Sequence, residues 1–215
     1  MKCKKRGLFL AGAALLVGFV LWTAAVCFAD VQAIGPGGTA VGFGTLNGAF
    51  HRLTGVHMEL YVLTDWLGLI PVVTALGFGL LGLIQWIRRG SIRKVDRSLP
   101  VLGGYYAAVL GAYLLFEILP VNYRPVLIEG RLEASYPSST TLLVLTVMPA
   151  AMLQLRTRLR CRRSCRWVNG SLAVFTGFML LARTVSGVHW LSDILGGILL
   201  SGSLLLFYAA FNSSE

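Results

Sequence analysis

Between two long apolar runs near the C-terminus of the chain lies the stretch Arg183-Thr184-Val185-Ser186-Gly187-Val188-His189-Trp190-Leu191-Ser192-Asp193. Ionisable side chains at the edge of a bilayer are costly, so an arginine, a histidine and an aspartate here indicate a function. His189 and Asp193 are four residues apart, and they share a helix face if Asp193 lies in the first turn of the last helix. Asp193 would then accept from one imidazole nitrogen and leave the other basic, as in an activated nucleophile. Arg183 would offer a planar fork of donors to phosphate oxygens.

The same stretch also has a purely structural interpretation. A histidine near a helix start and beside Trp190 fits an aromatic anchor at the membrane surface. The surroundings of His189 decide between the two interpretations.

The composition is that of an integral membrane protein. The 215 residues are 56% hydrophobic and 13% charged, and the mean hydropathy is +0.73. Runs of about 20 apolar residues are long enough to cross a bilayer core of about 30 Å. Such runs lie at roughly 7–29, 64–87, 101–119, 139–155, 167–185 and 193–211. They predict an all-α, polytopic bundle of six membrane-spanning helices that forms one domain over residues 1–215.

The first run resembles a secretory signal, because it has a basic start and small residues before Asp30. At about 23 residues it is longer than a typical signal core, and Cys27-Phe28-Ala29 is a poor cleavage site. We therefore expect a retained first span. Cleavage would not move the later loops to the other side of the membrane.

Most basic residues gather on alternate loops. They are Lys2, Lys4, Lys5 and Arg6 before the first run, Arg88, Arg89, Arg93, Lys94 and Arg97 after the second, and Arg156, Arg158, Arg160, Arg162, Arg163 and Arg166 after the fourth. The positive-inside rule places these loops and both termini in the cytoplasm, as in a bacterial plasma-membrane protein. The anionic headgroups of the inner leaflet are their natural partners, so the net charge of +10 does not indicate nucleic acid.

Arg52, Arg124, Arg131 and Arg183 fall on the opposite, extracytoplasmic side and have no topological reason to be there. Among the cysteines, Cys161 and Cys165 lack accompanying metal ligands, so we expect no zinc site.

The longest outer segment covers residues 30–63. Its glycines and Pro36 predict turns, because their spacing is not that of a phosphate-binding loop. The apolar pattern over 46–61 predicts a short amphipathic helix at the outer membrane surface. We expect His51 and His57 to be solvated or interfacial there.

The outer loop after the third run ends in Tyr136-Pro137-Ser138-Ser139-Thr140-Thr141, which is typical of a helix N-cap. The free amides of such a helix start can bind an anion, although simple capping explains the pattern equally well. The same outer face also carries Arg124, Arg183 and His189. Two arginine forks and a ring of amides around a histidine are what phosphoryl transfer through a phosphohistidine requires.

These residues resemble the type 2 phosphatidic acid phosphatase superfamily, the lipid phosphate phosphatases related to vanadium haloperoxidases. That family carries the motifs Lys, six residues, Arg-Pro; Pro-Ser-Gly-His; and Ser-Arg, five residues, His, three residues, Asp. The corresponding residues here are Glu117 and Arg124-Pro125; Pro137-Ser138-Ser139-Thr140; and Ala182-Arg183, His189 and Asp193.

The resemblance implies a role for each matching residue. His189 would be the nucleophile that takes the phosphoryl group, and Asp193 would orient and polarise it. The phosphate oxygens would be held by Arg124, Arg183, Ser138, Ser139 and Thr140. No metal or cofactor is implied.

The chain departs from the family pattern at three positions. Glu117 replaces a lysine, Ala182 replaces a serine, and Thr140 replaces the histidine that protonates the leaving oxygen. A threonine hydroxyl cannot serve as a general acid near neutral pH, and such catalysis is worth about 10²–10⁴ in rate. Glu117 or Glu133 would be a possible proton donor.

Two functions follow. The first is a lipid phosphatase at the extracytoplasmic face, acting on a polyprenyl diphosphate such as undecaprenyl diphosphate or on a phosphatidyl phosphate. The second is a protein that keeps the fold and binds lipid phosphate, or a membrane partner, without turnover. The spans are nearly free of polar groups, which disfavours a transporter.

Overall fold

The structure is a computed structural model that describes residues 2–212, with side chains from residue 5 onward. The side chains of Lys2 and Lys4 in the predicted N-terminal basic cluster therefore lie outside the described part. Among the described residues, six helical segments are long and apolar enough to cross a membrane, which confirms the predicted all-α bundle.

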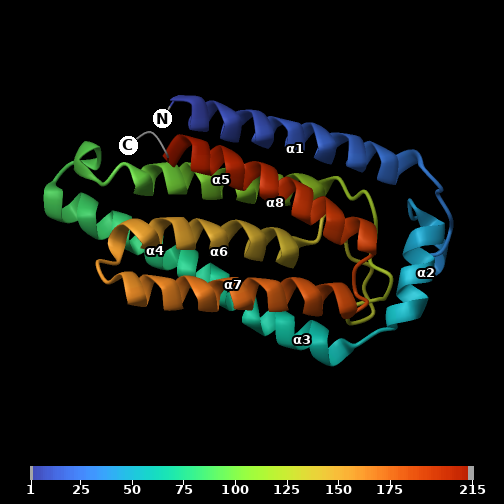
Figure 1. Ribbon diagram of the computed structural model, residues 1–215. Coiled ribbons are helices and arrows are strands. Elements are labelled where there is room, and N and C mark those ends of the chain that lie inside the picture. Colours follow the sequence, from blue (N-terminus) through green and yellow to red (C-terminus); the bar gives the residue numbers. More distant parts are fainter. Residues whose placement is uncertain (1, 213–215) are drawn as a thin grey trace.

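The spans run nearly parallel along one axis (Figure 1). They are α1 (Lys2–Phe28), α3 (Met58–Leu67) continued by α4 (Leu69–Arg89), α5 (Ser98–Ile118), α6 (Ser139–Arg158), α7 (Arg162–Val185) and α8 (Leu191–Asn212). The predicted start of the fourth span at residue 139 is correct. The other five spans begin two to six residues earlier than the predicted runs, because polar residues that precede the apolar runs are already helical.

The central helix of the bundle is α6, which packs against α4, α5, α7 and α8. Polar groups tie it to its neighbours, since the Tyr105 hydroxyl donates to the carbonyl of Thr146 at 3.1 Å and Gln154 Nε2 donates to the Tyr208 hydroxyl. Helix α1 lies along α8, where Ser203 Oγ donates to the carbonyl of Gly12 at 2.9 Å. Interhelical hydrogen bonds of this kind stabilise helix packing where water is absent.

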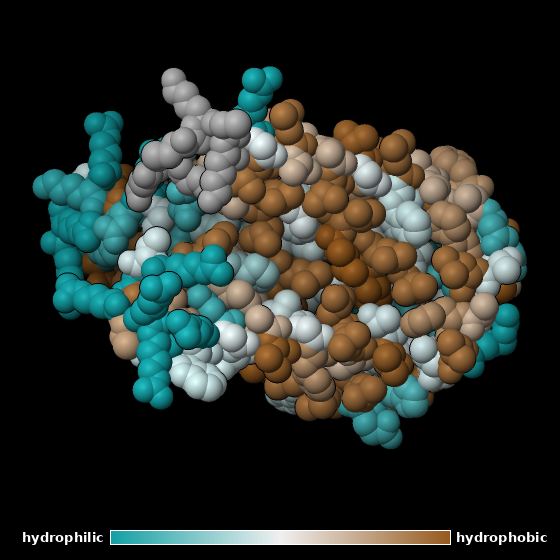
Figure 2. Space-filling model, in the orientation of Figure 1, coloured by the Kyte–Doolittle hydropathy of each residue, from teal (hydrophilic) through white to brown (hydrophobic). Residues whose placement is uncertain are grey.

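The two ends of the bundle differ in charge. The described chain ends and the α4–α5 and α6–α7 connections lie at one end, and α2 lies at the other (Figure 1). In the space-filling view hydrophilic residues crowd the first end and a hydrophobic belt covers the middle (Figure 2). The loops that carry Arg88–Arg97 and Arg156–Arg166 are thus on the opposite end from the loops that carry Arg124 and His189.

The predicted helix over 46–61 is wrong in extent. Helix α2 (Gly44–Thr54) ends at Gly55, which has a positive φ of 70°, and α3 begins a new helix at Met58. Helix α2 lies across the end of the bundle, where Asn47 Oδ1 accepts from the amide of Ser192 at 3.1 Å at the start of α8. The predicted glycine-rich turn is present as a short 3-10 helix, η1 (Pro36–Gly38).

Candidate active site

The loop between α5 and α6 folds back on itself as a short antiparallel hairpin. The amide of Arg124 donates to the carbonyl of Glu133 at 3.0 Å, and the amide of Ser135 donates to the carbonyl of Asn122 at 2.9 Å. At the tip, Glu129 and Gly130 have positive φ angles of 50° and 76°, as a tight two-residue hairpin turn requires. This pairing fixes the positions of four polar residues near the start of α8, namely Asn122, Arg124, Glu133 and Ser135.

His189 and Asp193 are joined through Ser135. The Ser135 hydroxyl donates to Asp193 Oδ2 at 2.6 Å and lies 2.9 Å from His189 Nδ1. The Ser135 hydroxyl has one proton, and it donates that proton in the hydrogen bond to Asp193. Ser135 Oγ must therefore accept the hydrogen bond from Nδ1–H of His189. His189 is then the tautomer whose Nε2 is unprotonated.

The expected direct contact between Asp193 and the imidazole is therefore replaced by a relay through a serine. Asp193 does lie in the first turn of α8, as predicted, whereas His189 lies in the loop before that helix. The hairpin places Ser135 between them. A loop residue without helical periodicity gives no sequence signal for this position.

The Asp193 carboxylate is fully buried and well satisfied. Oδ1 accepts from Asn122 Nδ2 at 2.9 Å and from the Ser192 hydroxyl at 3.2 Å, and Oδ2 also accepts from the amide of Trp190 at 3.2 Å. A buried carboxylate is tolerated when donors surround it in this way. Asp193 thus has a fixed position, and it fixes Ser135 in turn.

The loop that carries His189 packs tightly on the α2–α3 connection. The amide of His57 donates to the carbonyl of Ser186 at 2.9 Å, and Gly187 has a positive φ of 70°. A Cβ atom at Gly187 would lie 2.0 Å from the carbonyl oxygen of Gly55, so only glycine fits. Nearby, His51 packs on Trp190 with ring centroids 5.4 Å apart.

Two buried arginines lie on the Nε2 side of His189. Arg183, which is 1% exposed, places Nη2 at 3.4 Å from Nε2 and donates from Nη1 to Thr64 Oγ1 at 3.1 Å. Arg124 is 8% exposed. Both guanidinium groups lie over the ring of Tyr61, with their central carbons 5.6 Å (Arg124) and 4.8 Å (Arg183) from its centroid.

Several donors of these guanidinium groups are left over. Nη1 of Arg124 and Nε of Arg183 are buried and have no hydrogen-bond partner in the described part of the chain. Nε of Arg124 lies 3.1 Å from Glu133 Oε2, which is an ion pair without hydrogen-bond geometry. Buried donors without partners are rare in folded proteins, and a cluster of them beside a histidine indicates an anion site.

The ionisation of His189 follows from this setting. Burial of the ring, together with the positive charges of Arg183 and Arg124, holds the pKa of His189 well below its ordinary value of 6.5. The imidazole is therefore neutral at pH 7. A neutral imidazole whose Nε2 is unprotonated, here facing Nη2 of Arg183, can act as a nucleophile.

The N-terminus of α6 lies on the same side. Ser138 is the N-cap, as predicted, and its hydroxyl accepts from the amide of Thr141 at 3.5 Å. Its own amide donates to the carbonyl of Asp193 at 3.2 Å and is not free for an anion. The amides of Ser139 and Thr140 have no acceptor among the described residues, so they remain as the donors of this helix start.

A polar cavity and an apolar groove meet at this helix start. The cavity, about 300 Å³, is lined by Arg124, Glu117, Glu133 and Ser135 among others. The groove, about 460 Å³, runs between α3, α4, α5 and α6. Tyr113, Ser139 and Leu142 line both.

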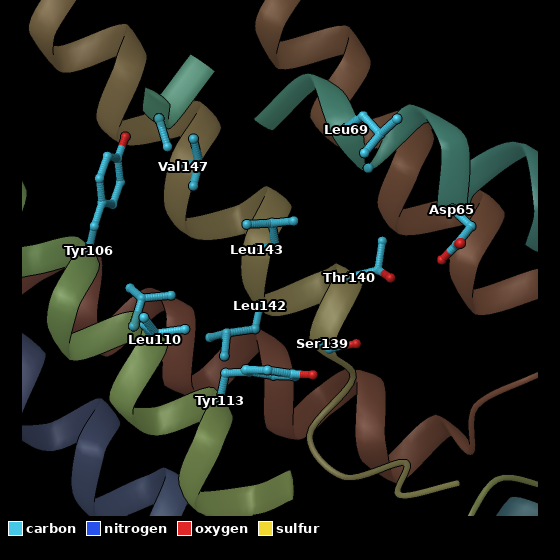
Figure 3. Close-up of a pocket in the computed structure, with 13 residues that line it drawn as sticks. Asp65, Leu69, Tyr106, Leu110, Tyr113, Ser139, Thr140, Leu142, Leu143 and Val147 are labelled. Atoms are coloured by element: carbon cyan, nitrogen blue, oxygen red, sulfur yellow. The ribbon is translucent and has the colours of Figure 1, made fainter. Parts of the chain in front are cut away.

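Most polar side chains of the groove lie at one end, and the hydroxyl of Tyr106 lies at the other. Figure 3 shows Asp65, Ser139, Thr140 and the hydroxyl of Tyr113 together at one end, while Leu110, Tyr106 and Val147 lie toward the other. Neither hollow is lined by His189 or Arg183, which lie deeper. The site in this structure is thus closed over the nucleophile.

The structure therefore brings the sequence-predicted residues to one end of the bundle, with Thr140 on the groove side and Glu117 and Glu133 on the cavity side. Sequence reasoning missed Asn122, Ser135, Tyr61 and Thr64. The first two are polar residues of a loop already suspected. Tyr61 was assigned to the surface helix predicted over 46–61, and Thr64 is the first residue of the predicted second span, 64–87.

Comparisons with known proteins agree with this arrangement. A family model described as PAP2 superfamily matches residues 75–214. Among solved structures, the chain is similar to a transmembrane PAP2 type phosphatidylglycerolphosphate phosphatase from Bacillus subtilis, with a TM-score of 0.55, 19% sequence identity and 93% of each chain covered. At this identity the likeness shows the fold. The comparison with curated proteins finds no match.

Proposed function

This chain belongs to the PAP2 superfamily, and we propose that it hydrolyses a lipid phosphate at the extracytoplasmic face through a phosphohistidine intermediate. Membership of the family supports a phosphatase activity for a multi-pass membrane protein. The substrate, the intermediate and the side of the membrane are the proposed part. The observation that carries the proposal is the set of unpartnered arginine donors beside the free Nε2 of His189.

In the proposed reaction, the phosphoryl group binds between Arg124, Arg183 and the amides at the start of α6. Nε2 of His189 attacks phosphorus, and the bond to the leaving oxygen breaks. The phosphohistidine carries a positive imidazole, which Ser135 and Asp193 stabilise from the Nδ1 side. Water then attacks phosphorus and releases phosphate and neutral His189.

Glu133 supports an anion site by filling part of it. Its carboxylate lies 3.1 Å from Arg124 Nε, at the mouth of the polar cavity, and the Glu133 side chain is 40% exposed. A carboxylate in this position stands in for a phosphate oxygen. We expect the substrate to displace it, because a phosphate offers more acceptors and more charge.

The apolar groove supports a lipid rather than a soluble substrate. It leaves the helix start of α6 and is lined by residues of α3 to α6 that include the exposed Leu69 and Leu110. An acyl or prenyl chain would lie there while the phosphate is held at the polar end. Phosphatidyl phosphates and polyprenyl diphosphates both fit this description.

The proposed face follows from the charge distribution. The basic connections lie at the end of the bundle opposite the site, and the positive-inside rule puts that end in the cytoplasm. Those arginines would face the anionic headgroups of the inner leaflet.

A second candidate function rests on Thr140, because the position that matches the family's acid cannot donate a proton near neutral pH. A protein without an acid would bind lipid phosphate and turn it over poorly. The test is phosphate release from undecaprenyl diphosphate and phosphatidic acid in detergent micelles. His57→Ala, which removes an exposed histidine outside the site, is the matched control for His189→Ala.

We expect wild type and His57→Ala to release phosphate and His189→Ala to release none. Rapid quenching with a radiolabelled lipid should trap an acid-labile, base-stable phosphoryl label that His189→Ala lacks. If wild type releases no phosphate from either lipid and Thr140→His does, the natural protein binds lipid phosphate without turnover and its phosphate-binding residues are correctly placed.

A further inference from the structure

One face of α3 borders the site. Tyr61, Thr64, Asp65 and Gly68 follow the spacing i, i+3, i+4, i+7, which places them on one side of the helix. Tyr61 lies under both arginines, Thr64 accepts from Arg183, and Asp65 and Gly68 line the groove. This face lies outside residues 75–214, which the family model matches.

Asp65 is an unusual residue for its place. It is exposed within an apolar helical segment of 32 residues, Met58–Arg89, that is long enough to span the membrane. Among the described residues its carboxylate has no hydrogen bond and no ion pair within 4 Å. An ionisable group in a span is costly, so an unpartnered one indicates a function.

Asp65 is also close to the phosphate cradle, which is formed by Arg124, Arg183 and the amides at the start of α6. It follows Thr64, which binds Arg183 directly, and its charge is near enough to interact electrostatically with Arg183. Figure 3 shows its carboxyl group pointing toward Thr140 across the polar end of the groove. Ser139 lies at the same end.

The position of the leaving oxygen follows from the proposed function, on which this inference rests. That oxygen joins the phosphoryl group, held by the arginines and the α6 amides, to the lipid chain, held in the groove. It therefore lies where the cradle meets the groove. Asp65 is the one carboxyl-bearing residue among those that line the groove.

We propose that Asp65 is the general acid that protonates the leaving oxygen, the task for which position 140 has no suitable group. As Nε2 of His189 bonds to phosphorus, the bond from phosphorus to the lipid oxygen breaks and its electron pair goes to that oxygen. The oxygen takes the proton of the Asp65 carboxyl group and leaves as the lipid alcohol, or as the lipid monophosphate from a diphosphate.

The second step restores Asp65. Its carboxylate takes a proton from the attacking water, whose oxygen bonds to phosphorus as the bond to Nε2 breaks and its electron pair returns to His189. The sum is one water consumed and one phosphate released.

The other two carboxyl groups are less suited to this task. Glu133 is held in an ion pair with Arg124 and lines the polar cavity and not the groove, so it lies away from the lipid side of the leaving oxygen. Glu117 lines the polar cavity and not the groove, so it lies on the phosphate side of the leaving oxygen.

The test uses the dependence on the leaving group. Full-length wild type, Asp65→Asn and Glu59→Gln would be assayed on phosphatidic acid, whose leaving group is a poor alkoxide, and on p-nitrophenyl phosphate, whose leaving group is a good phenolate. Glu59 is a matched control, because it is an exposed carboxylate in the first turn of the same helix and does not line the groove.

We expect Asp65→Asn to lower kcat on phosphatidic acid by about 100- to 10,000-fold and to change kcat on p-nitrophenyl phosphate by less than about threefold. Glu59→Gln should match wild type on both. Thr140→His in the Asp65→Asn background should restore part of the lost rate on phosphatidic acid, which a folding defect would not allow.

Four outcomes would overturn the assignment. Equal loss on both substrates means that Asp65 has a structural role, and no loss on phosphatidic acid means that it has none. A selective loss in Glu117→Gln would move the acid to that residue. If wild type releases no phosphate from either substrate, the proposed function fails first and the assignment with it.

Discussion

Replacing Ser135 with alanine removes the side chain that bridges His189 and Asp193 while leaving both residues in place. The Ser135 hydroxyl makes a 2.6 Å bond to Asp193 Oδ2 and a 2.9 Å bond to His189 Nδ1. A hydrogen bond to a charged group contributes about 1.5–3 kcal/mol. In the proposed reaction, Ser135 makes such a bond to the positively charged phosphohistidine ring. Since each 1.36 kcal/mol is tenfold, Ser135→Ala should lower kcat/KM by about 10- to 150-fold.

The assay is phosphate release from a lipid phosphate in micelles, with the unfolding temperature measured in the same detergent. Ser203→Ala is the matched control, because it also removes a buried hydroxyl that donates to one acceptor, the carbonyl of Gly12 at 2.9 Å, but far from His189. It should lower stability by about 1 kcal/mol and leave kcat/KM unchanged. A folded Ser135→Ala protein with kcat/KM within about twofold of wild type would refute the relay, because Asp193 would then act on His189 directly or not at all.

Three further predictions follow from the site and its loops. Arg183→Lys should lower kcat/KM by about 10- to 100-fold, because a lysine cannot offer the planar fork, whereas Arg131→Lys at an exposed position should not change it. On p-nitrophenyl phosphate, whose leaving group needs no acid, the lowered pKa of His189 should keep kcat/KM level from about pH 8 down to about 6.5, and the rate should fall only at lower pH as the imidazole takes a proton. A fall in rate that begins above about pH 7 as the pH is lowered would contradict this. Gly187→Ala should lower stability by at least about 1–3 kcal/mol, because it adds backbone strain at a φ of 70° and a Cβ that would lie 2.0 Å from the carbonyl oxygen of Gly55. Gly177→Ala, where a Cβ meets nothing within 4 Å, should not lower the unfolding temperature.

The spans could be predicted because hydrophobic length is a strong signal. A run of apolar residues has one stable arrangement in a bilayer, so the start of α6 and the order of the helices follow from the residues alone. Ser138 as N-cap has a similarly local cause, since it depends on a side chain and the next turn of its own helix. The residues that match the third family motif keep the family's spacing, and they place Arg183 at the end of α7 and Asp193 at the start of α8.

The relay could not be predicted, because it depends on contacts across the chain. Ser135 meets His189 only because a hairpin pairs residues 122 and 135 by backbone hydrogen bonds, and that pairing carries no periodic pattern. Tyr61 and Asp65 were hidden for another reason. Gly55 divides an apparently continuous amphipathic stretch, so Tyr61 enters the second span instead of a surface helix, whereas Asp65 was already inside the predicted run 64–87 and only the structure shows that it lines the groove.

The shared wall formed by Tyr113, Ser139 and Leu142 bears on how the products part. Inorganic phosphate is soluble only in water and the dephosphorylated lipid only in the bilayer, and the polar cavity and the apolar groove lead away from the wall on its two sides. Under the proposed function, each product would therefore leave on its own side of the wall, the phosphate toward water and the lipid toward the bilayer.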